Sequence, residues 1–364
     1  MNRQSEGVFV YVGTYTQTES FARGKAEGIY VYRMDPLTGA LIYVSKIVGV
    51  FNPSYLVIAP ERRRLYAVNE HYGDVRPDGA VSAFAIDPVT KELTFLNQQS
   101  THGLAPCYVS INRTGHYLLV ANYMSGNVAV LPIEADGRLA EASDLVQHAG
   151  SGPLHGQEGP HAHCVVPDPA SDYVVAADKG ADKLFIYRLD TNKGRLLPAD
   201  PPSVQAEPGA GPRHFVFHPH GRMAYAINEL GCTITAYAYD RQCGALQAVQ
   251  SVPTLPAGSE GRNWTADIHV APSGQFVYGS NRGHDSIVIY RVDEQTGKLS
   301  YVGHEPTQGR TPRNFVIDPS GRFLLAANQN TDTIVTFRID AQSGKLLATG
   351  HVTEAPTPVC LKML

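Results

Sequence analysis

Short apolar segments separated by polar turns run along the whole chain. Six of these segments end in Asn or Asp and read RRLYAVNE, HYLLVANY, DYVVAADK, RMAYAINE, QFVYGSNR and RFLLAANQ. Short segments with a period of two are typical of β-strands, and no long segment with the helical period competes with them. The pattern therefore predicts an all-β protein.

A Pro-led phrase precedes most of these segments. It reads PSYLVIAP from Pro53, PHAHCVVP from Pro160, PRHFVFHP from Pro212 and PRNFVIDP from Pro312, with weaker copies at Pro106 and Thr265. A third strand and, after a Gly-containing turn, a fourth strand follow each copy. Four strands repeated over roughly 46 to 54 residues are the signature of a propeller blade.

The two ends of the chain complete the count of blades. Residues 8–48 supply only a second, a third and a fourth strand, and the missing first strand is PVCLKML from Pro358. Six complete copies and this shared blade predict a seven-bladed β-propeller of four-stranded antiparallel blades. The last blade is closed by N-terminal strands plus the C-terminal strand, which removes the open sheet edges. We expect residues 1–364 to form a single domain; two β-sandwich domains are a weaker alternative, because no linker-like change in composition divides the repeat.

Charge and cysteine usage limit the partners of the protein. The net charge of −4 gives no basic field that would attract nucleic acid or an anionic membrane. The N-terminus has only a five-residue apolar run after Glu6, so no signal peptide is expected. Five scattered cysteines fit a reducing compartment. We expect a cytoplasmic protein without nucleic-acid or membrane partners, either a monomer or a weak homo-oligomer.

The candidate site lies where the blades face one mouth of the central channel. The start of the first strand and the end of the second strand lie at the same end of each blade, so both positions gather at one face. When the copies are matched on their first proline, the next position holds Ser54, Cys107, His161, Arg213, Ala266, Arg313 and Val359. Two residues further on, every copy is apolar except the one with His163, so we expect His163 to be structural and His161 to act at the mouth.

The second strands supply further candidates. We expect the repeated Asn or Asp at their ends to bond the backbone of the following turn. The next residue varies between copies and includes Glu229 and Arg282. With His161 and Arg213 they predict an anion-binding catalytic site that has its own acid–base group.

The roles within this set are partly open. Glu229 and His161 are both candidate bases, whereas an arginine cannot be a base at neutral pH. We therefore expect Arg213 and Arg282 to bind the substrate's anionic group or the oxyanion, and we assign Asp267 and His269 to substrate binding as well. We expect His214, His218 and His220 to lie on blade surfaces.

Two other kinds of site are weaker. The H-x-H pair His161 and His163 would put both rings on one face of a strand, as a zinc site needs, but a third ligand is missing and the arginines oppose a cation. A hydrolase triad lacks a serine in a G-x-S-x-G turn. We expect neither a metal nor a cofactor.

The phrases GPHAH, GAGPRHFVFHP, AYAINEL, WTADIHVAPSGQFVYGSNRGHDS and TPRNFVIDPSGRFLLAANQ carry a family resemblance. Across the whole chain they resemble the propeller-type 6-phosphogluconolactonase family, which also includes fungal 3-carboxy-cis,cis-muconate lactonizing enzymes. The resemblance implies a seven-bladed propeller and metal-independent chemistry on a lactone ring. In the muconate enzymes a His, two Arg and a Glu have been put forward as the active-site set; they correspond to His161, Arg213, Glu229 and Arg282.

The leading hypothesis is therefore a metal-independent lactonase acting on a small anionic lactone. The substrate implied is 6-phosphogluconolactone, hydrolysed to 6-phosphogluconate in the oxidative pentose phosphate pathway. One alternative is a cycloisomerase acting on a carboxylated muconate or muconolactone, since that substrate is also anionic. The other is a non-catalytic propeller that binds a partner, which the fold alone supports equally well.

Overall fold

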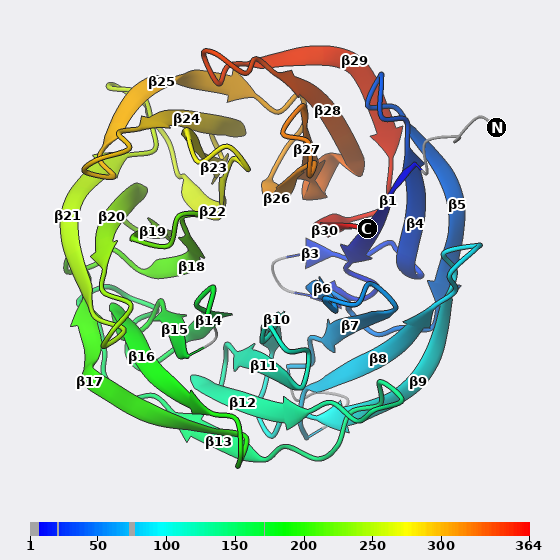
Figure 1. Ribbon diagram of the computed structural model, residues 1–364. Helices are drawn as coiled ribbons and strands as arrows, with labels where there is room; N and C mark the ends of the chain where they lie inside the picture. Colours follow the sequence, from blue (N-terminus) through cyan, green and yellow to red (C-terminus); the bar gives the residue numbers. More distant parts are fainter. Residues whose placement is uncertain (1–6, 20–21, 73–76, 171) are drawn as a thin grey trace.

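The computed structural model describes residues 7–19, 22–72, 77–170 and 172–364, and Figure 1 shows them as a ring of seven sheets around a central axis. Each sheet has four antiparallel strands in sequence order, the innermost strand first, except where the two ends of the chain meet. The predicted fold class is confirmed.

Six blades are continuous in sequence, and we number them along the chain. Blade 1 contains β6 (Leu56–Ile58), β7 (Arg64–Asn69), β8 (Ala80–Ile86) and β9 (Leu93–Ser100). Blade 2 contains β10 (Pro106–Ile111), β11 (Tyr117–Asn122), β12 (Asn127–Pro132) and β13 (Asp144–Gln147). Blade 3 contains β14 (Ala162–Pro167), β15 (Tyr173–Asp178), β16 (Lys183–Asp190) and β17 (Arg195–Gln205).

The next three blades repeat this order. Blade 4 contains β18 (Pro212–Phe217), β19 (Met223–Asn228), β20 (Thr233–Tyr239) and β21 (Leu246–Pro253). Blade 5 contains β22 (Trp264–Val270), β23 (Phe276–Arg282), β24 (Ser286–Val292) and β25 (Leu299–Pro306). Blade 6 contains β26 (Pro312–Ile317), β27 (Phe323–Asn328), the short 3-10 helix η1 (Gln329–Thr331), β28 (Thr333–Ile339) and β29 (Leu346–Glu354).

Blade 7 joins the two ends of the chain, as predicted. Its strand order is β30 (Pro358–Met363), β1 (Val8–Thr14), β4 (Gly28–Met34) and β5 (Leu41–Val48). The C-terminal β30 pairs with β1 from Val10 opposite Met363 to Thr14 opposite Pro358. A small two-stranded sheet, β2 (Thr18–Glu19) and β3 (Ala22–Arg23), lies between β1 and β4 in sequence. The closed ring leaves the inner strand of every blade paired.

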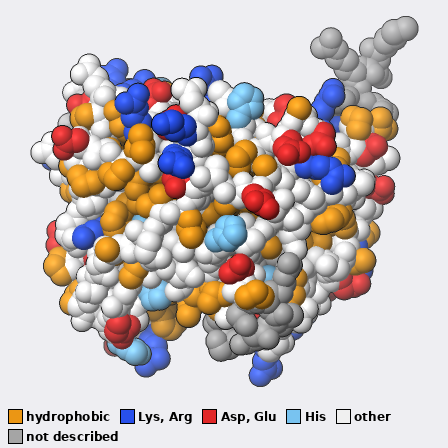
Figure 2. All heavy atoms as spheres, turned by 90° about the horizontal axis from the view of Figure 1, so that it is seen from below, with side chains coloured by type: hydrophobic (Ala, Val, Ile, Leu, Met, Phe, Trp, Pro, Cys, Tyr) orange, Lys and Arg blue, Asp and Glu red, His pale blue; other side chains and the backbone are white. Residues whose placement is uncertain are grey.

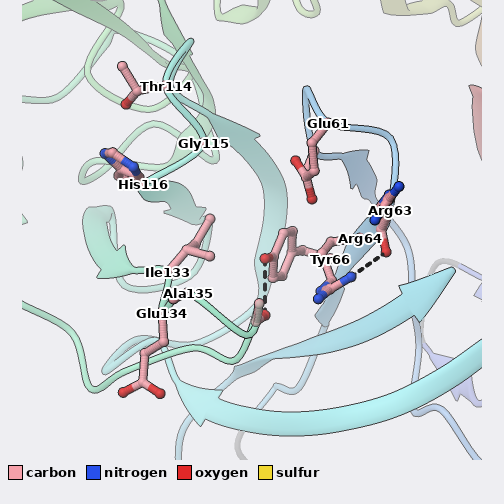
Figure 3. Close-up of a pocket in the computed structure, with 12 residues that line it drawn as sticks. Glu61, Arg63, Arg64, Tyr66, Thr114, Gly115, His116, Ile133, Glu134 and Ala135 are labelled. Atoms are coloured by element: carbon pink, nitrogen blue, oxygen red, sulfur yellow. Dashed lines mark hydrogen bonds between the residues drawn. The ribbon is translucent and has the colours of Figure 1, made fainter.

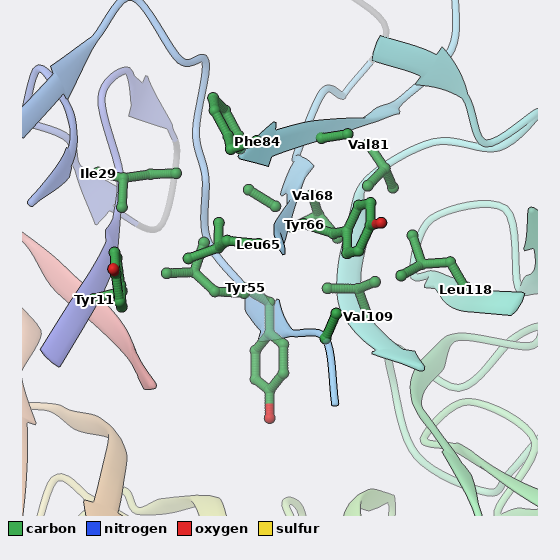
Figure 4. Close-up of a cluster of buried hydrophobic side chains, with 14 of the residues drawn as sticks. Tyr11, Ile29, Tyr55, Leu65, Tyr66, Val68, Val81, Phe84, Val109 and Leu118 are labelled. Atoms are coloured by element: carbon green, nitrogen blue, oxygen red, sulfur yellow. The ribbon is translucent and has the colours of Figure 1, made fainter. Parts of the chain in front are cut away.

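Burial follows from the stacking of neighbouring blades. The second and third strands of a blade are almost entirely buried, because adjacent blades cover both of their faces. The fourth strands alternate between half-buried and exposed positions, with Tyr43 and Leu347 among their exposed side chains. On the side of the ring seen in Figure 2, acidic and basic side chains are interspersed with such apolar ones. Figure 4 shows how one buried cluster joins Tyr11 of blade 7 to Leu65 of blade 1 and Val109 of blade 2.

The Gly-containing turns between third and fourth strands are tightly specified. In blade 6, Oδ1 of Asp340 accepts the backbone N–H of Ser343 at 2.7 Å, and the N–H of Gly344 donates to the carbonyl of Asp340 at 2.8 Å. Gly344 has a φ of +73°, and a Cβ there would lie 2.3 Å from the ring of Phe276 in the preceding blade. Glycine is needed here because both the conformation and the close approach exclude a side chain.

The repeated Asn or Asp at the end of the second strand behaves in two ways. Asp178 accepts the N–H groups of Gly180 and Ala181, which are in the following turn, as predicted. The side-chain amides of Asn122 and Asn328 instead donate to the carbonyls of Thr101 and Thr307, which lie in the segment that enters the blade. These two asparagines therefore bind the segments that enter their own blades, because an amide can donate to a carbonyl and a carboxylate cannot.

Candidate active site

A cavity of about 400 Å³ lies at the face where first strands begin and second strands end. Its lining comes largely from two positions that recur around the ring. The residues that follow the Asn or Asp of a second strand are Glu70, Tyr123, Lys179, Glu229 and Arg282, and those near the start of a first strand are Cys107, His163 and Arg313. Tyr72 and Met124 complete the wall. The cavity therefore brings together side chains from six blades.

The inner position is an unpaired bulge residue in the first strands β10, β14, β18 and β26. The pairing of β18 with β19 skips Arg213, between Pro212 opposite Asn228 and His214 opposite Ile227. The same irregularity leaves Cys107 unpaired in β10 and Arg313 unpaired in β26. A bulge redirects a side chain, and these bulges stand where the strands border the site.

The register of β14 corrects the expected place of His163. Ala162 pairs with Asp178 and Cys164 with Ala177, so His163 is the bulge residue that matches Arg213. The prediction that His163 takes an apolar core position is wrong. The copies were matched on Pro160 and Pro167, but the pairing shows that Ala162 matches Pro212, two residues later. The matching second proline is Pro169, within the phrase VVPDP, which parallels FVIDP of blade 6.

His161 lies behind the cavity wall. Its backbone N–H donates to Oδ1 of Asp178 at 2.7 Å, and its Nδ1 is 3.0 Å from the carbonyl of Tyr123. The half-buried ring stacks on Tyr123, with centroids 4.7 Å apart, and Tyr123 itself lines the cavity. The catalytic role given to His161 stays a prediction, and the structure places a tyrosine between this ring and the cavity.

Glu229 binds three cationic side chains, two of them predicted. Its Oε2 lies 2.8 Å from Nε of Arg213 and 2.7 Å from Nη2 of Arg282, and its Oε1 lies 2.9 Å from Nζ of Lys179. Burial acts to raise the pKa of Glu229, but the charges of Arg282, Lys179 and Arg213 outweigh it and hold the pKa well below its ordinary value. Glu229 is therefore ionised at neutral pH, and its carboxylate holds the three cations in place.

The three cations remain charged at neutral pH. Burial lowers the pKa of Arg282 to about 10, and its Nη2 also donates to the carbonyl of Thr265 at 2.8 Å. For Lys179, burial acts to lower the pKa, but Glu229 and Tyr123 more than offset it, so the pKa is raised. The Nζ of Lys179 also donates to the hydroxyl of Tyr123 at 2.9 Å. Sequence reasoning missed Lys179, although it stands directly after Asp178 as Glu229 stands after Asn228.

A second ionic group forms the opposite wall. Nη2 of Arg313 donates to the hydroxyl of Tyr15 at 3.0 Å, which in turn donates to Oε2 of Glu70 at 3.0 Å. The hydroxyl of Tyr72 donates to the other oxygen of Glu70. Burial acts to lower the pKa of Arg313, but Tyr15 and Glu70 raise it above the ordinary value. The cavity is thus lined by cations on two sides.

His163 stands between these two groups. It is 5% exposed, and its Nδ1 lies 3.6 Å from Sγ of Cys107. Burial, together with the charge of Arg213, lowers the pKa of His163 well below its ordinary value, so the imidazole is neutral at neutral pH. Burial raises the pKa of the Cys107 thiol, so it is not a thiolate nucleophile at neutral pH. A neutral imidazole that faces the cavity has the protonation state of a general base.

Asp267 and His269 lie outside the cavity wall. Asp267 is buried and bonds to His214 and His269, with Oδ1 2.7 Å from Nδ1 of His214. The His269 ring packs edge-on against Phe315, with centroids 4.8 Å apart. Direct substrate binding by these two residues stays a prediction. The expectation that His214 and His218 lie on blade surfaces is wrong: they are 4% and 6% exposed, and His214 borders the central channel.

A larger cavity of about 570 Å³ lies at the opposite end of blades 1 and 2, where first strands turn into second strands (Figure 3). Glu61, His116 and Glu134 stand on its walls without converging, and the hydroxyl of Tyr66 is bonded to the carbonyl of Gly137 at 3.1 Å. The residues predicted to be functional do not line it. We therefore place the candidate site at the cationic cavity.

No cluster of three or more His, Cys, Asp or Glu within the described ranges is arranged to hold a metal ion. His161 and His163 do not converge, since Nδ1 of one faces the Tyr123 carbonyl and Nδ1 of the other faces Cys107. The described residues also contain no helix long and apolar enough to cross a membrane.

A seven-bladed ring with a cationic cavity and a neutral imidazole defines an enzyme-like propeller whose site suits an anion. Residues 9–363 match the family described as lactonase, 7-bladed beta-propeller, and the chain belongs to this family.

Curated relatives match most of the chain. It is 38% identical over 308 residues to the protein of Bacillus subtilis (strain 168) named 6-phosphogluconolactonase, covering 85% of this chain and 84% of the relative. It is 35% identical over 315 residues to the protein of the same name from Formosa agariphila, covering 85% of this chain and 86% of the relative. The solved structure of the periplasmic gluconolactonase of Pseudomonas aeruginosa superposes with a TM-score of 0.92 at 36% identity, covering 98% of this chain and 99% of that one.

Proposed function

We propose that this lactonase hydrolyses 6-phosphogluconolactone to 6-phosphogluconate. The observation that carries the proposal is the charge around the cavity: among the residues that the structure describes, Lys179, Arg213, Arg282 and Arg313 stand against the carboxylates Glu70 and Glu229. Such a surplus favours an anionic substrate. The names of the Bacillus and Formosa relatives support a phosphorylated sugar lactone.

We place the phosphate beside Lys179 and Arg282. Three cations share the single carboxylate Glu229 on this side, whereas Arg313 on the other side faces Glu70 across Tyr15. The uncompensated positive charge is therefore greater at Glu229, and guanidinium and ammonium groups both bind phosphate well.

We assign the general base to His163. Its neutral imidazole takes a proton from a water molecule as the water oxygen attacks the lactone carbonyl carbon. The resulting oxyanion is stabilised by the cationic wall. When the bond from this carbon to the ring oxygen breaks, the imidazolium returns the proton to that oxygen, and the new carboxylic acid ionises. Glu229 is the weaker candidate for this role, because both of its carboxylate oxygens are engaged in ion pairs with Lys179, Arg213 and Arg282.

The second candidate substrate is the unphosphorylated lactone. The name of the Pseudomonas relative, a gluconolactonase, favours it. Turnover of 6-phosphogluconolactone and gluconolactone by the same preparation, each corrected for spontaneous hydrolysis, distinguishes the two. A kcat/KM for the phosphorylated lactone at least tenfold above that for the other supports the proposal. Turnover of a carboxymuconate alone would instead support a cycloisomerase.

We further propose that the protein works in the cytoplasm as a monomer or a weak homo-oligomer, without a metal or cofactor. The five cysteines, Cys107, Cys164, Cys232, Cys243 and Cys360, are all free thiols, which suits a reducing compartment. Size-exclusion chromatography with light scattering tests the oligomeric state, and activity after exhaustive chelation tests the metal independence.

A further inference from the structure

The buried His214 contacts Arg213, the arginine that ion-pairs with Glu229. Nε2 of His214 lies 3.2 Å from Nη1 of Arg213, and its Nδ1 lies 2.7 Å from Oδ1 of Asp267. His214 and Asp267 are 4% and 2% exposed, so water does not substitute for these contacts. Neither residue lines the cationic cavity.

The chemistry of the partners fixes the protonation of the His214 ring. A guanidinium group only donates hydrogen bonds, so Nε2 must be the acceptor of the bond from Arg213. The proton of the neutral ring is then on Nδ1 and is donated to Asp267. Burial and the charge of Arg213 lower the pKa of His214 to about 4, which agrees with a neutral ring at neutral pH.

Asp267 is itself held on several sides. The Nδ2 of Asn314 and the backbone N–H of Phe315 donate to Oδ2, and the N–H of Ile268 donates to Oδ1 at 3.0 Å. His269 adds a contact of 3.1 Å between Nε2 and Oδ2. The carboxylate therefore presents a fixed acceptor to His214, with donors all around its other oxygen.

We propose that Asp267 and His214 form a positioning pair that aims Arg213, and through it Glu229, without touching the substrate. Arg213 donates to the carbonyl of Ala266 at 2.5 Å through the same Nη1 that faces His214, and its Nε contacts Glu229 at 2.8 Å. A change in the His214 tautomer would thus move the group that organises the cationic wall. Only the expected loss of activity rests on the proposed function; the hydrogen bonds of the pair do not depend on it.

The sharpest variant is Asp267→Asn. Its amide keeps more of these hydrogen bonds when its oxygen faces Asn314 and Phe315 than when it faces Ile268 alone. This orientation leaves the NH₂ group facing Nδ1 of His214. Nδ1 then has to accept, the ring proton moves to Nε2, and that proton points at Arg213. We expect kcat/KM to fall roughly 10- to 100-fold, as when an outer-shell partner that orients a functional group is lost.

Two further variants separate positioning from folding. His214→Gln keeps a side-chain oxygen that accepts from Arg213 and should retain more activity than His214→Leu, which has no acceptor. His218→Gln is the matched control, because His218 is similarly buried but bonds to the Gly274 carbonyl in the β22–β23 turn of the next blade, at the end of the ring away from the site. It should leave kcat and KM unchanged. Thermal midpoints identify any variant that loses activity by unfolding.

The deciding measurement is ¹⁵N NMR of the histidine side chains, with His214 identified by its absence from the His214→Gln spectrum. The proposal predicts a neutral ring protonated at Nδ1 in the wild-type protein and at Nε2 in Asp267→Asn. A charged ring or an Nε2 proton in the wild type would overturn it, whether or not the protein is a lactonase. Wild-type kcat/KM in a folded Asp267→Asn would overturn it as well. If no lactone is turned over, the proposed function fails alone, and loss of 6-phosphogluconate affinity in Asp267→Asn tests the pair instead.

Discussion

His163 and Arg213 occupy the same place in successive blades, each as the bulge residue next to the start of a first strand. Each is nearly buried, and His163 borders the cavity while Arg213 ion-pairs with Glu229 on its wall. This equivalence distinguishes the two histidines of the EGPHAH segment: His163 is the bulge residue that borders the cavity, and His161 is not.

His163→Phe should lower kcat by roughly 10²-fold or more, because it removes the neutral imidazole that we assign as the base. His161→Ala should have a smaller effect, since Tyr123 separates that ring from the cavity. Turnover of both variants on the same lactone, corrected for spontaneous hydrolysis, makes the comparison. If His161→Ala is inactive and a folded His163→Phe is active, the base is His161.

Glu229→Gln should lower the free energy of unfolding by about 3 kcal/mol, since it leaves three buried or half-buried cations without their shared carboxylate. It should also raise KM for the phosphorylated lactone, because the cationic wall loses its organiser. Denaturant unfolding and steady-state kinetics measure the two effects. The pH dependence of kcat decides the role: if Glu229→Gln removes its acid limb, Glu229 is the base after all.

Stability should decrease as the pH falls below about 6.5. The pKa values of His163 and His214 are lower in the folded protein than their ordinary value of 6.5, so in this range the unfolded chain binds protons that the folded protein does not. The loss continues toward pH 4 at up to about 1.4 kcal/mol per pH unit for each histidine. Glu229, whose pKa is also depressed, adds to the loss at still lower pH.

The control for this pH dependence is His214→Gln, which should show a slope smaller by up to one proton between pH 6 and pH 4.5. Denaturant unfolding at several pH values in this range measures it. An unchanged slope would contradict the assignment of a neutral, buried His214.

Deleting residues 358–364 should cause aggregation or loss of cooperative unfolding. The deletion removes β30 and leaves the edge of β1 unpaired, with the buried Val10 and Val12 beside it. A single cooperative transition of the full chain would support one domain over residues 1–364. A soluble truncated protein with an unchanged thermal midpoint would contradict the role of the shared blade.

The sequence was sufficient for the ring and its closure because both depend on a repeated phrase. PVCLKML lacks a following strand and VFVYVGTYT lacks a preceding one, so the shared blade follows from matching the copies. The residue after each repeated Asn or Asp was also a visible signal. It identified Glu229 and Arg282. The equivalent positions of three other blades hold Glu70, Tyr123 and Lys179, and all five side chains line the cavity.

The register of a single first strand was not predictable in this way. Two prolines in PHAHCVVP imitate the spacing of PRHFVFHP, although the pairing of Ala162 with Asp178 places the bulge two residues later. A bulge inserts one unpaired residue, so it leaves no period in the sequence. The contact between Arg213 and His214 was likewise hidden, because adjacent residues on a regular strand point to opposite faces.

The most direct test of the account is the preference for a phosphorylated lactone in the wild type and in Lys179→Met. We compare kcat/KM for 6-phosphogluconolactone with that for gluconolactone, after chelation and with spontaneous hydrolysis subtracted. We expect the wild type to prefer the phosphorylated lactone, and Lys179→Met to lose most of this preference while still hydrolysing gluconolactone. No acceleration of either lactone by the folded wild-type protein, or an unchanged preference in Lys179→Met, would contradict it.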